Sequence, residues 1–164
     1  MLLSAKQASH VITPSKAMLD ALLLWLPEIE NKCSVNHYGT LRDLYFPDTA
    51  PRTWRGDDGT LRLLYVSVYY PHKNPGVLCV ATQQLNESGI RCRATITMNL
   101  DETEIAGGVL DRTLLGRSTD SGHVTLGHYP YRSLPELYRS HDVFVFPSIS
   151  ETFGHPMAEA LSVG

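Results

Sequence analysis

The chain of 164 residues is about as long as one globular domain, and its net charge of -3 lacks the basic excess of a nucleic-acid-binding protein. Its apolar and aromatic content is typical of a soluble globular protein. No apolar run approaches the roughly 18 residues needed to cross a bilayer, and residues 1–4 are too short an apolar start for a signal peptide. The three cysteines are far apart and form no CxxC pair, which indicates reduced thiols in a cytoplasmic protein and not a disulfide framework or a zinc site.

The first part of the chain predicts two short strands separated by a helix. Residues 10–13 favour a strand, and Ser15 is suited to cap a helix that runs to about Trp25. Residues 33–36 favour a second strand. Residues 43–59 contain prolines and glycines with little periodicity, so we interpret them as a crossing or linker segment.

From residue 61 onward, strands alternate with helices. Residues 63–68 favour a strand, and the next helix is expected to begin at Pro75 with Asn74 as its cap. Ser133 and Glu136 form the pattern of a capping box at the start of a later helix. Further strands are expected at residues 93–98, 124–126 and 143–146. This alternation predicts an α/β fold: a Rossmann-like, doubly wound parallel sheet with helices on both faces.

The end of the chain predicts a strand, a loop and then a helix that begins near Pro156. In an open α/β sheet this order places the loop at the carboxyl edge of the strand, where ligands usually bind. Free backbone N–H groups at the start of such a helix suit a phosphate. The residues that would provide them are Phe153, Gly154 and His155.

Two carboxylates, Glu151 in the loop and Glu159 in the helix, flank these N–H groups. Carboxylates can accept hydrogen bonds from paired hydroxyls, such as those of a sugar or a ribose. Together with the backbone N–H groups that can bind phosphate, these carboxylates are typical of a nucleotide-sugar pocket. The alternative is a solvated loop glutamate and an ordinary carboxylate near a helix start.

The pattern P-S-x-x-E-x-F-G-x-P-x-x-E-A, at residues 147–160, resembles the signature of the group 1 (family 4) retaining glycosyltransferases of the GT-B fold. Residues 11–15 and 35–39 resemble the end of that family's first domain, although Tyr38 stands where the family usually has asparagine. Residues 65–74 resemble the first strand and loop of its second domain. Val68 stands where the family often has an arginine.

The resemblance implies transfer of a sugar from a nucleotide donor with retention at the anomeric carbon. Glu151 would hold hydroxyls of the donor sugar, and Glu159 would hold the ribose. Lys73 matches the family's phosphate-binding lysine and would stabilise the leaving diphosphate, so Glu151 and Lys73 are the catalytic candidates; a solvated loop charge is the alternative for Lys73. Tyr129 would line the base pocket, with a tight turn carrying a tyrosine on its rim as the alternative. The N–H groups of Phe153, Gly154 and His155 would hold the phosphates.

The resemblance also implies a domain organisation and a set of partners. Residues 1–56 would be a remnant of the acceptor-side domain with a linker, and residues 57–164 an incomplete nucleotide-sugar-binding domain. The expected partners are a UDP- or GDP-sugar donor and a glycan or lipid-linked acceptor bound by the missing domain, with peripheral association to a membrane and no nucleic acid.

The expected enzyme uses no cofactor and no metal ion. His155 and Glu159 are four residues apart and could bind a metal, but no third ligand has a suggestive spacing. It would be cytoplasmic and serve polysaccharide biosynthesis, and the isolated fragment is expected to be inactive. Two other functions stay open: a nucleotide-sugar-binding module without turnover, and a nucleotide-sugar epimerase of the same architecture. A glycosidase would need two carboxyl groups placed around one glycosidic bond. A helix start suited to phosphate argues against that function.

Overall fold

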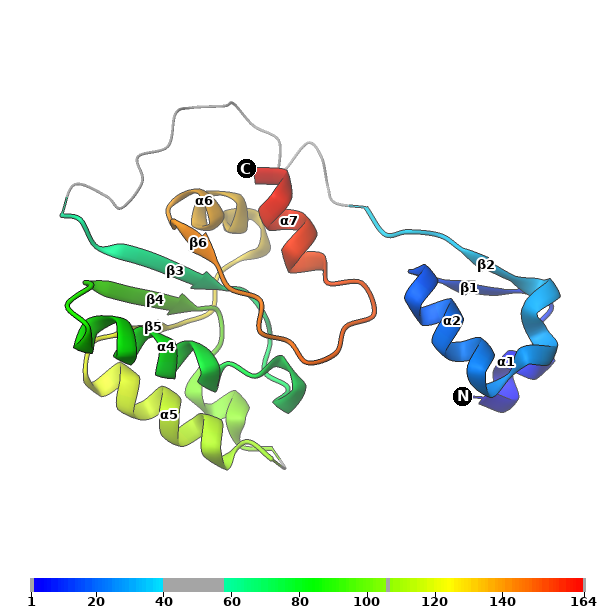
Figure 1. Cartoon of the computed structure of the whole chain (residues 1–164), viewed down its shortest axis with the longest axis horizontal. Helices are drawn as coiled ribbons and strands as arrows, with labels where there is room; N and C mark the ends of the chain where they lie inside the picture. Colours follow the sequence, from blue (N-terminus) through cyan, green and yellow to red (C-terminus); the bar gives the residue numbers. More distant parts are fainter. Residues whose placement is uncertain (1, 40–57, 106, 164) are drawn as a thin grey trace. The chain divides into compact units, whose positions relative to one another are not determined.

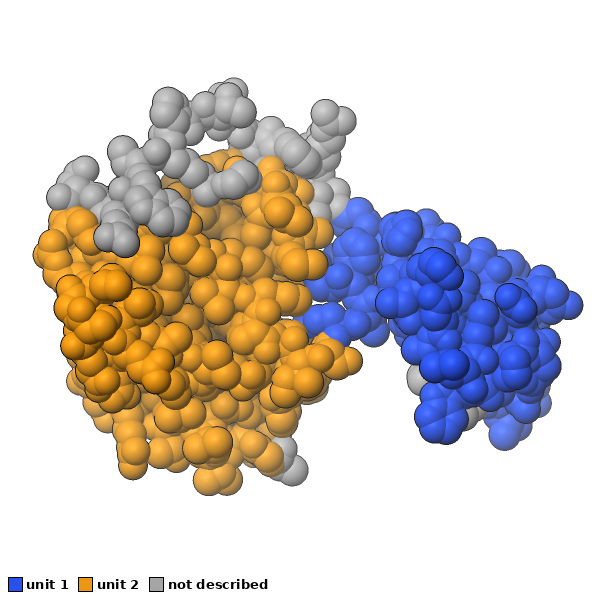
Figure 2. Space-filling model, in the orientation of Figure 1, with its two compact units in different colours: residues 1–40, 151–155 blue, residues 41–150, 156–164 orange. Residues whose placement is uncertain are grey.

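The computed structural model describes residues 2–39, 58–105 and 107–163. The chain forms two compact units, each described by itself (Figure 2): unit 1 is Met1–Thr40 with Glu151–His155, and unit 2 is Leu41–Ser150 with Pro156–Gly164. The predicted domain boundary at residues 56 and 57, and most of the predicted crossing segment, lie outside the described residues.

Unit 1 contains a short parallel β-α-β arrangement. Its elements are α1 (Leu2–Gln7), β1 (Val11–Thr13), α2 (Lys16–Trp25), a 3-10 helix (Pro27–Lys32) and β2 (Cys33–Val35). The strands β1 and β2 pair in parallel. Ser15 caps α2 as predicted, because its side chain accepts a hydrogen bond from the Met18 N–H at 3.2 Å. The two predicted strands and the helix between them are therefore confirmed.

Unit 2 is built on a four-stranded sheet in the order β5-β4-β3-β6, with every neighbouring pair parallel. The strands are β3 (Leu61–Tyr65), β4 (Cys92–Ile96), β5 (Val124–Leu126) and β6 (Val143–Phe144). From β3 the chain first adds β4 and β5 on one side and then returns to add β6 on the other. This order confirms the predicted doubly wound parallel sheet.

Helices cover both faces of this sheet, α4 and α5 on one and α6 and α7 on the other (Figure 1). They are α4 (Gly76–Glu87), α5 (Val109–Asp120), α6 (Leu134–Arg139) and α7 (His155–Val163). Successive residues of the central segment alternate between the two cores, because side chains of a strand point to opposite faces. Leu63 and Tyr65 join the core under α4 and α5, whereas Leu64 and Val66 pack with α6 and α7.

One predicted helix start and one predicted capping bond differ from the structure. The helix after β3 begins at Gly76, because Asn74 has a left-handed backbone (φ 53°) and ends a 3-10 turn, Pro71–Lys73. The side chain of Ser133 makes no cap; its hydroxyl donates to the Pro130 carbonyl at 2.7 Å. In both places a 3-10 turn before the helix engages the residue that the predicted cap requires.

The register between β3 and β6 is set by a side-chain clamp. The Asp142 carboxylate accepts hydrogen bonds from the backbone N–H of Arg62 at 2.8 Å and from its guanidinium at 3.1 and 2.8 Å. The backbone N–H of Asp142 in turn donates to the Arg62 carbonyl at 2.8 Å. The Asp142 side chain is only 2% exposed, so the carboxylate depends on these donors for its solvation.

We predict that Asp142→Ala lowers the free energy of unfolding by about 2 kcal/mol, because it removes several charge-assisted hydrogen bonds and leaves donors of Arg62 without an acceptor. Chemical denaturation followed by circular dichroism measures this change. The matched control is Glu104→Ala, which breaks an exposed ion pair with Arg112 in the same unit and should cost no more than about 1 kcal/mol. Equal losses for the two variants would contradict the role of the clamp.

His141, next to this clamp, is held as a neutral imidazole. Its Nδ1 lies 2.7 Å from the Leu137 carbonyl, which can only accept, so Nδ1 carries the proton. Its Nε2 lies 2.8 Å from the Thr95 hydroxyl and accepts a hydrogen bond from it. Burial lowers the pKa of His141 below the ordinary value of 6.5, and the nearby Arg62 adds to this shift.

Since the pKa of His141 is lower in the folded protein, the unfolded chain binds more protons just below pH 6.5, and stability falls on acidification through that value. We predict that His141→Gln unfolds more easily than the parent chain at pH 8. The difference should shrink as the pH is lowered to 5, because only the parent loses this contribution. Urea titrations at a series of pH values measure it, and a difference that is independent of pH would contradict the prediction.

Candidate functional site

The strand order creates a switch point beside β3. Because β4 lies on one side of β3 and β6 on the other, and the connecting helices cover opposite faces, the winding of the chain reverses between β3 and β6. Ligands of open α/β sheets bind at such a point, outside the carboxyl ends of the strands. The predicted lysine loop follows β3 and the predicted glutamate loop follows β6, so both loops begin at this edge of the sheet.

The loop after β3 has a defined conformation. Lys73 ends the 3-10 turn and is half-buried, and its carbonyl accepts a hydrogen bond from the Tyr65 hydroxyl at 3.3 Å. The carbonyl of His72 accepts a hydrogen bond from the backbone N–H of Ile149 at 2.8 Å. This bond joins the loop after β3 to the loop after β6, so the two loops lie side by side at the switch point.

A buried hydroxyl lies in the second of these loops. The Oγ atom of Ser148 is inaccessible to solvent and has no hydrogen-bond partner among the described residues. Buried polar atoms in folded proteins are nearly always paired with protein, water or a ligand. Ser148 therefore places an unsatisfied hydroxyl beneath the surface of the loop after β6.

Glu159, in α7, is a buried carboxylate held by two tyrosines. Only 6% of the residue is exposed. Its Oε1 accepts a hydrogen bond from the Tyr131 hydroxyl at 3.1 Å, and its Oε2 accepts one from the Tyr138 hydroxyl at 3.0 Å. These bonds satisfy one acceptor on each oxygen, and each carboxylate oxygen has a second lone pair that a ligand hydroxyl can use.

Neither tyrosine was identified from the sequence as a site residue. Tyr138 fits the apolar face of the predicted helix, and Tyr131 ends the predicted base-pocket loop. A signal was nevertheless available, because a buried tyrosine hydroxyl usually finds a partner and a buried carboxylate requires donors. What could not be read from the sequence is that α6 and α7 pack on the same face of the sheet and bring these groups together.

Tyr129 is half-buried in the loop after β5 and packs against the core cluster under α6 and α7. Its ring lies 3.8 Å from the position that a Cβ atom of Gly127 would occupy. Tyr129 thus contributes to the packing of unit 2. Its contact with a base stays a prediction.

The residues Glu151–His155 belong to unit 1. The ring of Tyr38 stacks on that of His155 with centroids 4.9 Å apart, and it contacts Phe153 edge to face at 5.6 Å. The Ser15 hydroxyl donates to the Thr152 carbonyl at 3.1 Å. Glu151 is exposed. Tyr38 therefore packs on the aromatic rings of Phe153 and His155, two of the residues predicted to bind phosphate.

The seven predicted site residues thus fall into two groups. Lys73, Tyr129 and Glu159 belong to unit 2, and the other four belong to unit 1: Glu151, Phe153, Gly154 and His155. Within unit 2, the described contacts connect Glu159 to α6 and the Lys73 loop to the loop after β6. The assembly of both groups into one pocket stays a prediction.

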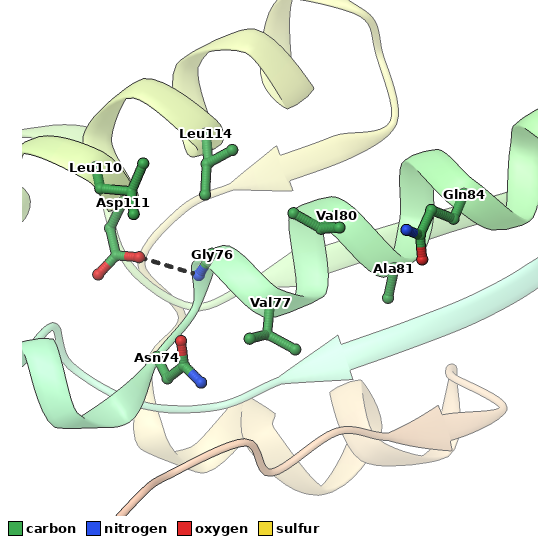
Figure 3. A pocket seen from close by; sticks show the side chains of 9 residues that line it. All are labelled: Asn74, Gly76, Val77, Val80, Ala81, Gln84, Leu110, Asp111 and Leu114. Carbon is green, nitrogen blue, oxygen red and sulfur yellow. Dashed lines mark hydrogen bonds between the residues drawn. The ribbon is translucent and has the colours of Figure 1, made fainter.

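A separate apolar cavity of about 320 Å³ lies between α4 and α5 (Figure 3). The carboxylate of Asp111 reaches across it and accepts a hydrogen bond from the Gly76 N–H at 3.3 Å. It also accepts one from the Tyr69 hydroxyl at 2.7 Å, and burial, together with this carboxylate, raises the pKa of that tyrosine. A Cβ atom at Gly76 would lie 2.6 Å from a carboxylate oxygen of Asp111, so α4 and α5 approach closely at this glycine. Its lining includes none of the predicted donor-site residues.

Two further findings concern metals and membranes. The part of the chain that the structure describes contains no group of three or more His, Cys, Asp or Glu side chains placed to hold a metal ion. Its helices include none that is both long enough and apolar enough to cross a membrane. The three cysteines are free, and burial raises the pKa of the Cys79 and Cys92 thiols, which makes them packing residues.

The family model described as "Glycosyl transferases group 1" matches residues 48–164, most of the chain. The chain therefore belongs to this family. It is also 44% identical over 52 residues to the O-antigen chain mannosyltransferase B of Escherichia coli, a match that covers 31% of this chain and 14% of the relative. The epimerase and binding-module alternatives are not favoured by these similarities.

Solved structures of glycosyltransferases with the GT-B fold share the architecture. Sucrose-phosphate synthase from Thermosynechococcus elongatus has a TM-score of 0.74 at 21% identity and aligns with 99% of this chain. HepE from Anabaena, solved in complex with UDP and glucose, has a TM-score of 0.72 at 19% identity over 95% of this chain. Trehalose-6-phosphate synthase, studied for glycosyl transfer with retention, has a TM-score of 0.73 at 12% identity over 99% of this chain.

The chain spans only part of these proteins: 42% of the first two solved chains and 44% of the third. Similarity at these identities establishes a shared fold. The predicted fold class and the predicted membership of the group 1 glycosyltransferases are confirmed.

Gly154 has a left-handed backbone (φ 83°) directly before α7. We predict that Gly154→Ala lowers the free energy of unfolding by about 1 kcal/mol, because this conformation strains a residue with a Cβ atom. The control is Gly116→Ala in the interior of α5, where a Cβ atom meets no other atom within 4 Å and alanine should be neutral or stabilising. Thermal melting compares the two variants, and a destabilisation confined to Gly116→Ala would contradict the prediction.

Proposed function

We propose that this chain forms the donor-binding part of a retaining glycosyltransferase, which transfers a sugar from a nucleotide diphosphate sugar to a glycan or lipid-linked acceptor. The observation that carries the proposal is the switch point between β3 and β6, where the Lys73 loop is hydrogen-bonded to the loop that bears the family's glutamate pattern. Family membership and the GT-B fold support it.

We assign the diphosphate of the donor to Lys73 and to the start of α7. The ammonium of Lys73 and the N-terminal N–H groups of α7 provide positive charge for a leaving group that becomes more negative toward the transition state. In this assignment the backbone N–H groups around Phe153, Gly154 and His155 bind the phosphates. Stabilisation of the leaving diphosphate is then the main catalytic contribution of these residues.

Hydroxyl groups of the donor are assigned to the two glutamates. Glu159 accepts hydrogen bonds from the ribose through the lone pairs that its tyrosines leave available. Glu151 accepts hydrogen bonds from the donor sugar and orients its anomeric carbon. The ring of Tyr129 lines the space beside the base.

The proposed donor nucleotide is UDP or GDP. HepE was solved with UDP and glucose, and the relative from Escherichia coli is an O-antigen chain mannosyltransferase, which supports a role in polysaccharide biosynthesis. Retention is supported by the likeness to trehalose-6-phosphate synthase. No protein nucleophile and no metal ion enter this scheme, and the reaction is assigned to the cytoplasmic side, with the enzyme associated peripherally with the membrane that carries its acceptor.

Calorimetry with UDP and GDP tests the donor assignment. We predict that the chain binds at least one of the two without transferring sugar, because the aligned part of the solved enzymes is less than half of their length. Glu159→Gln should weaken nucleotide binding about tenfold or more, because hydrogen bonds to a charged acceptor are stronger than those to a neutral amide. The glutamine keeps the size of the side chain, so the fold should persist.

Glu87→Gln is the matched control, because Glu87 is an exposed carboxylate at the C-terminal end of α4, whereas the loop after β3 leads into the N-terminal end of that helix. Its nucleotide affinity should equal that of the parent chain. Absence of binding to either nucleotide by a folded parent chain would overturn the proposed function. Equal affinity of the parent and Glu159→Gln would remove the ribose role from Glu159.

A further inference from the structure

The two tyrosines that hold Glu159 differ in their surroundings. Tyr138 is 4% exposed, whereas Tyr131 is 48% exposed. Both hydroxyls donate to the same carboxylate, one to each oxygen. Because the carboxylate is itself almost fully buried, access to it depends on these side chains.

Tyr138 is the fixed partner. Its hydroxyl also lies 3.1 Å from the carbonyl of Pro156, in the first turn of α7. Its ring packs edge to face on Phe144 of β6 at 5.4 Å and belongs to the core under α6 and α7. Moving this side chain would open a cavity in that core, so the hydrogen bond of Tyr138 to Oε2 of Glu159 is the more constrained of the two.

Tyr131 is the partner of Glu159 whose hydroxyl a ligand can replace. It begins a three-residue 3-10 turn, Tyr131–Ser133, two residues after Tyr129, and about half of its surface is in contact with solvent. A turn of this length has few intrinsic hydrogen bonds, and rotation of an exposed tyrosine side chain leaves no cavity in the core. With Tyr131 in place, Glu159 has only 6% of its surface left for a ligand.

We propose that the Tyr131 hydroxyl occupies the ribose-hydroxyl position on Oε1 of Glu159 when no donor is bound, and that the donor ribose replaces it. The replacement exchanges one neutral O–H donor for another on a buried carboxylate, so Glu159 is not left unpaired once the donor is bound. Tyr138 acts as the positioning residue that keeps the carboxylate in its rotamer during the exchange. This inference rests on the proposed nucleotide-sugar function and adds a residue that competes with the ligand.

The exchange predicts that removing the competing hydroxyl improves binding. Tyr131→Phe should bind UDP or GDP about fivefold more tightly than the parent chain, because the ribose no longer displaces a hydrogen bond. Tyr138→Phe should instead weaken binding about fivefold, because the carboxylate loses its fixed donor. Calorimetry measures both affinities, and thermal melting establishes that each variant is folded.

The 2′,3′-dideoxy analogue of the same nucleotide separates this mechanism from a general change in the pocket. It lacks the ribose hydroxyls, so Tyr131→Phe should leave its affinity unchanged. Unchanged or weaker binding of the ordinary nucleotide by Tyr131→Phe, or an equal gain for the dideoxy analogue, would overturn the exchange while leaving the donor assignment intact. A parent chain that binds neither ordinary nucleotide overturns both proposals.

Discussion

The pairing of β6 with β3, on the side of β3 opposite to β4, is the constraint on which the rest of unit 2 depends. The clamp between Arg62 and Asp142 fixes this pairing at the start of both strands, because a buried carboxylate must keep its donors. Once β6 is in place, the helices that flank it must cover the opposite face from α4 and α5. The loops after β3 and β6 then emerge together, and the bond between His72 and Ile149 joins them.

A second buried carboxylate links this frame to the site. Glu159 lies where α6 and α7 meet, and its two tyrosine partners come from the segment between β5 and β6. The same physical requirement therefore applies twice, because a buried carboxyl group needs hydrogen-bond donors: Arg62 supplies them to Asp142, and two tyrosines supply them to Glu159. The difference is that one donor to Glu159 comes from a half-exposed side chain, which a ligand can replace.

The family's glutamate pattern serves two structural roles along one short segment. Its first part, Glu151–His155, packs with unit 1 through Tyr38 and Ser15, whereas Glu159 is anchored within unit 2. A signature that is continuous in sequence is thus divided by its packing. Gly154, directly before α7, has a left-handed backbone, a conformation that glycine adopts without the strain of a Cβ atom.

Local patterns in the sequence determined the strands, the helix that Ser15 caps, the parallel α/β class and, through the ordered glutamate pattern, the family. These features depend on residues close together in the chain. The start of α4 and the capping bond of Ser133 differed from expectation, because a 3-10 turn precedes each helix and engages Asn74 or Ser133. Only the tertiary structure decided which groups surround Glu159, because Tyr131 and Tyr138 reach it across 28 and 21 residues when two helices pack on one face of the sheet.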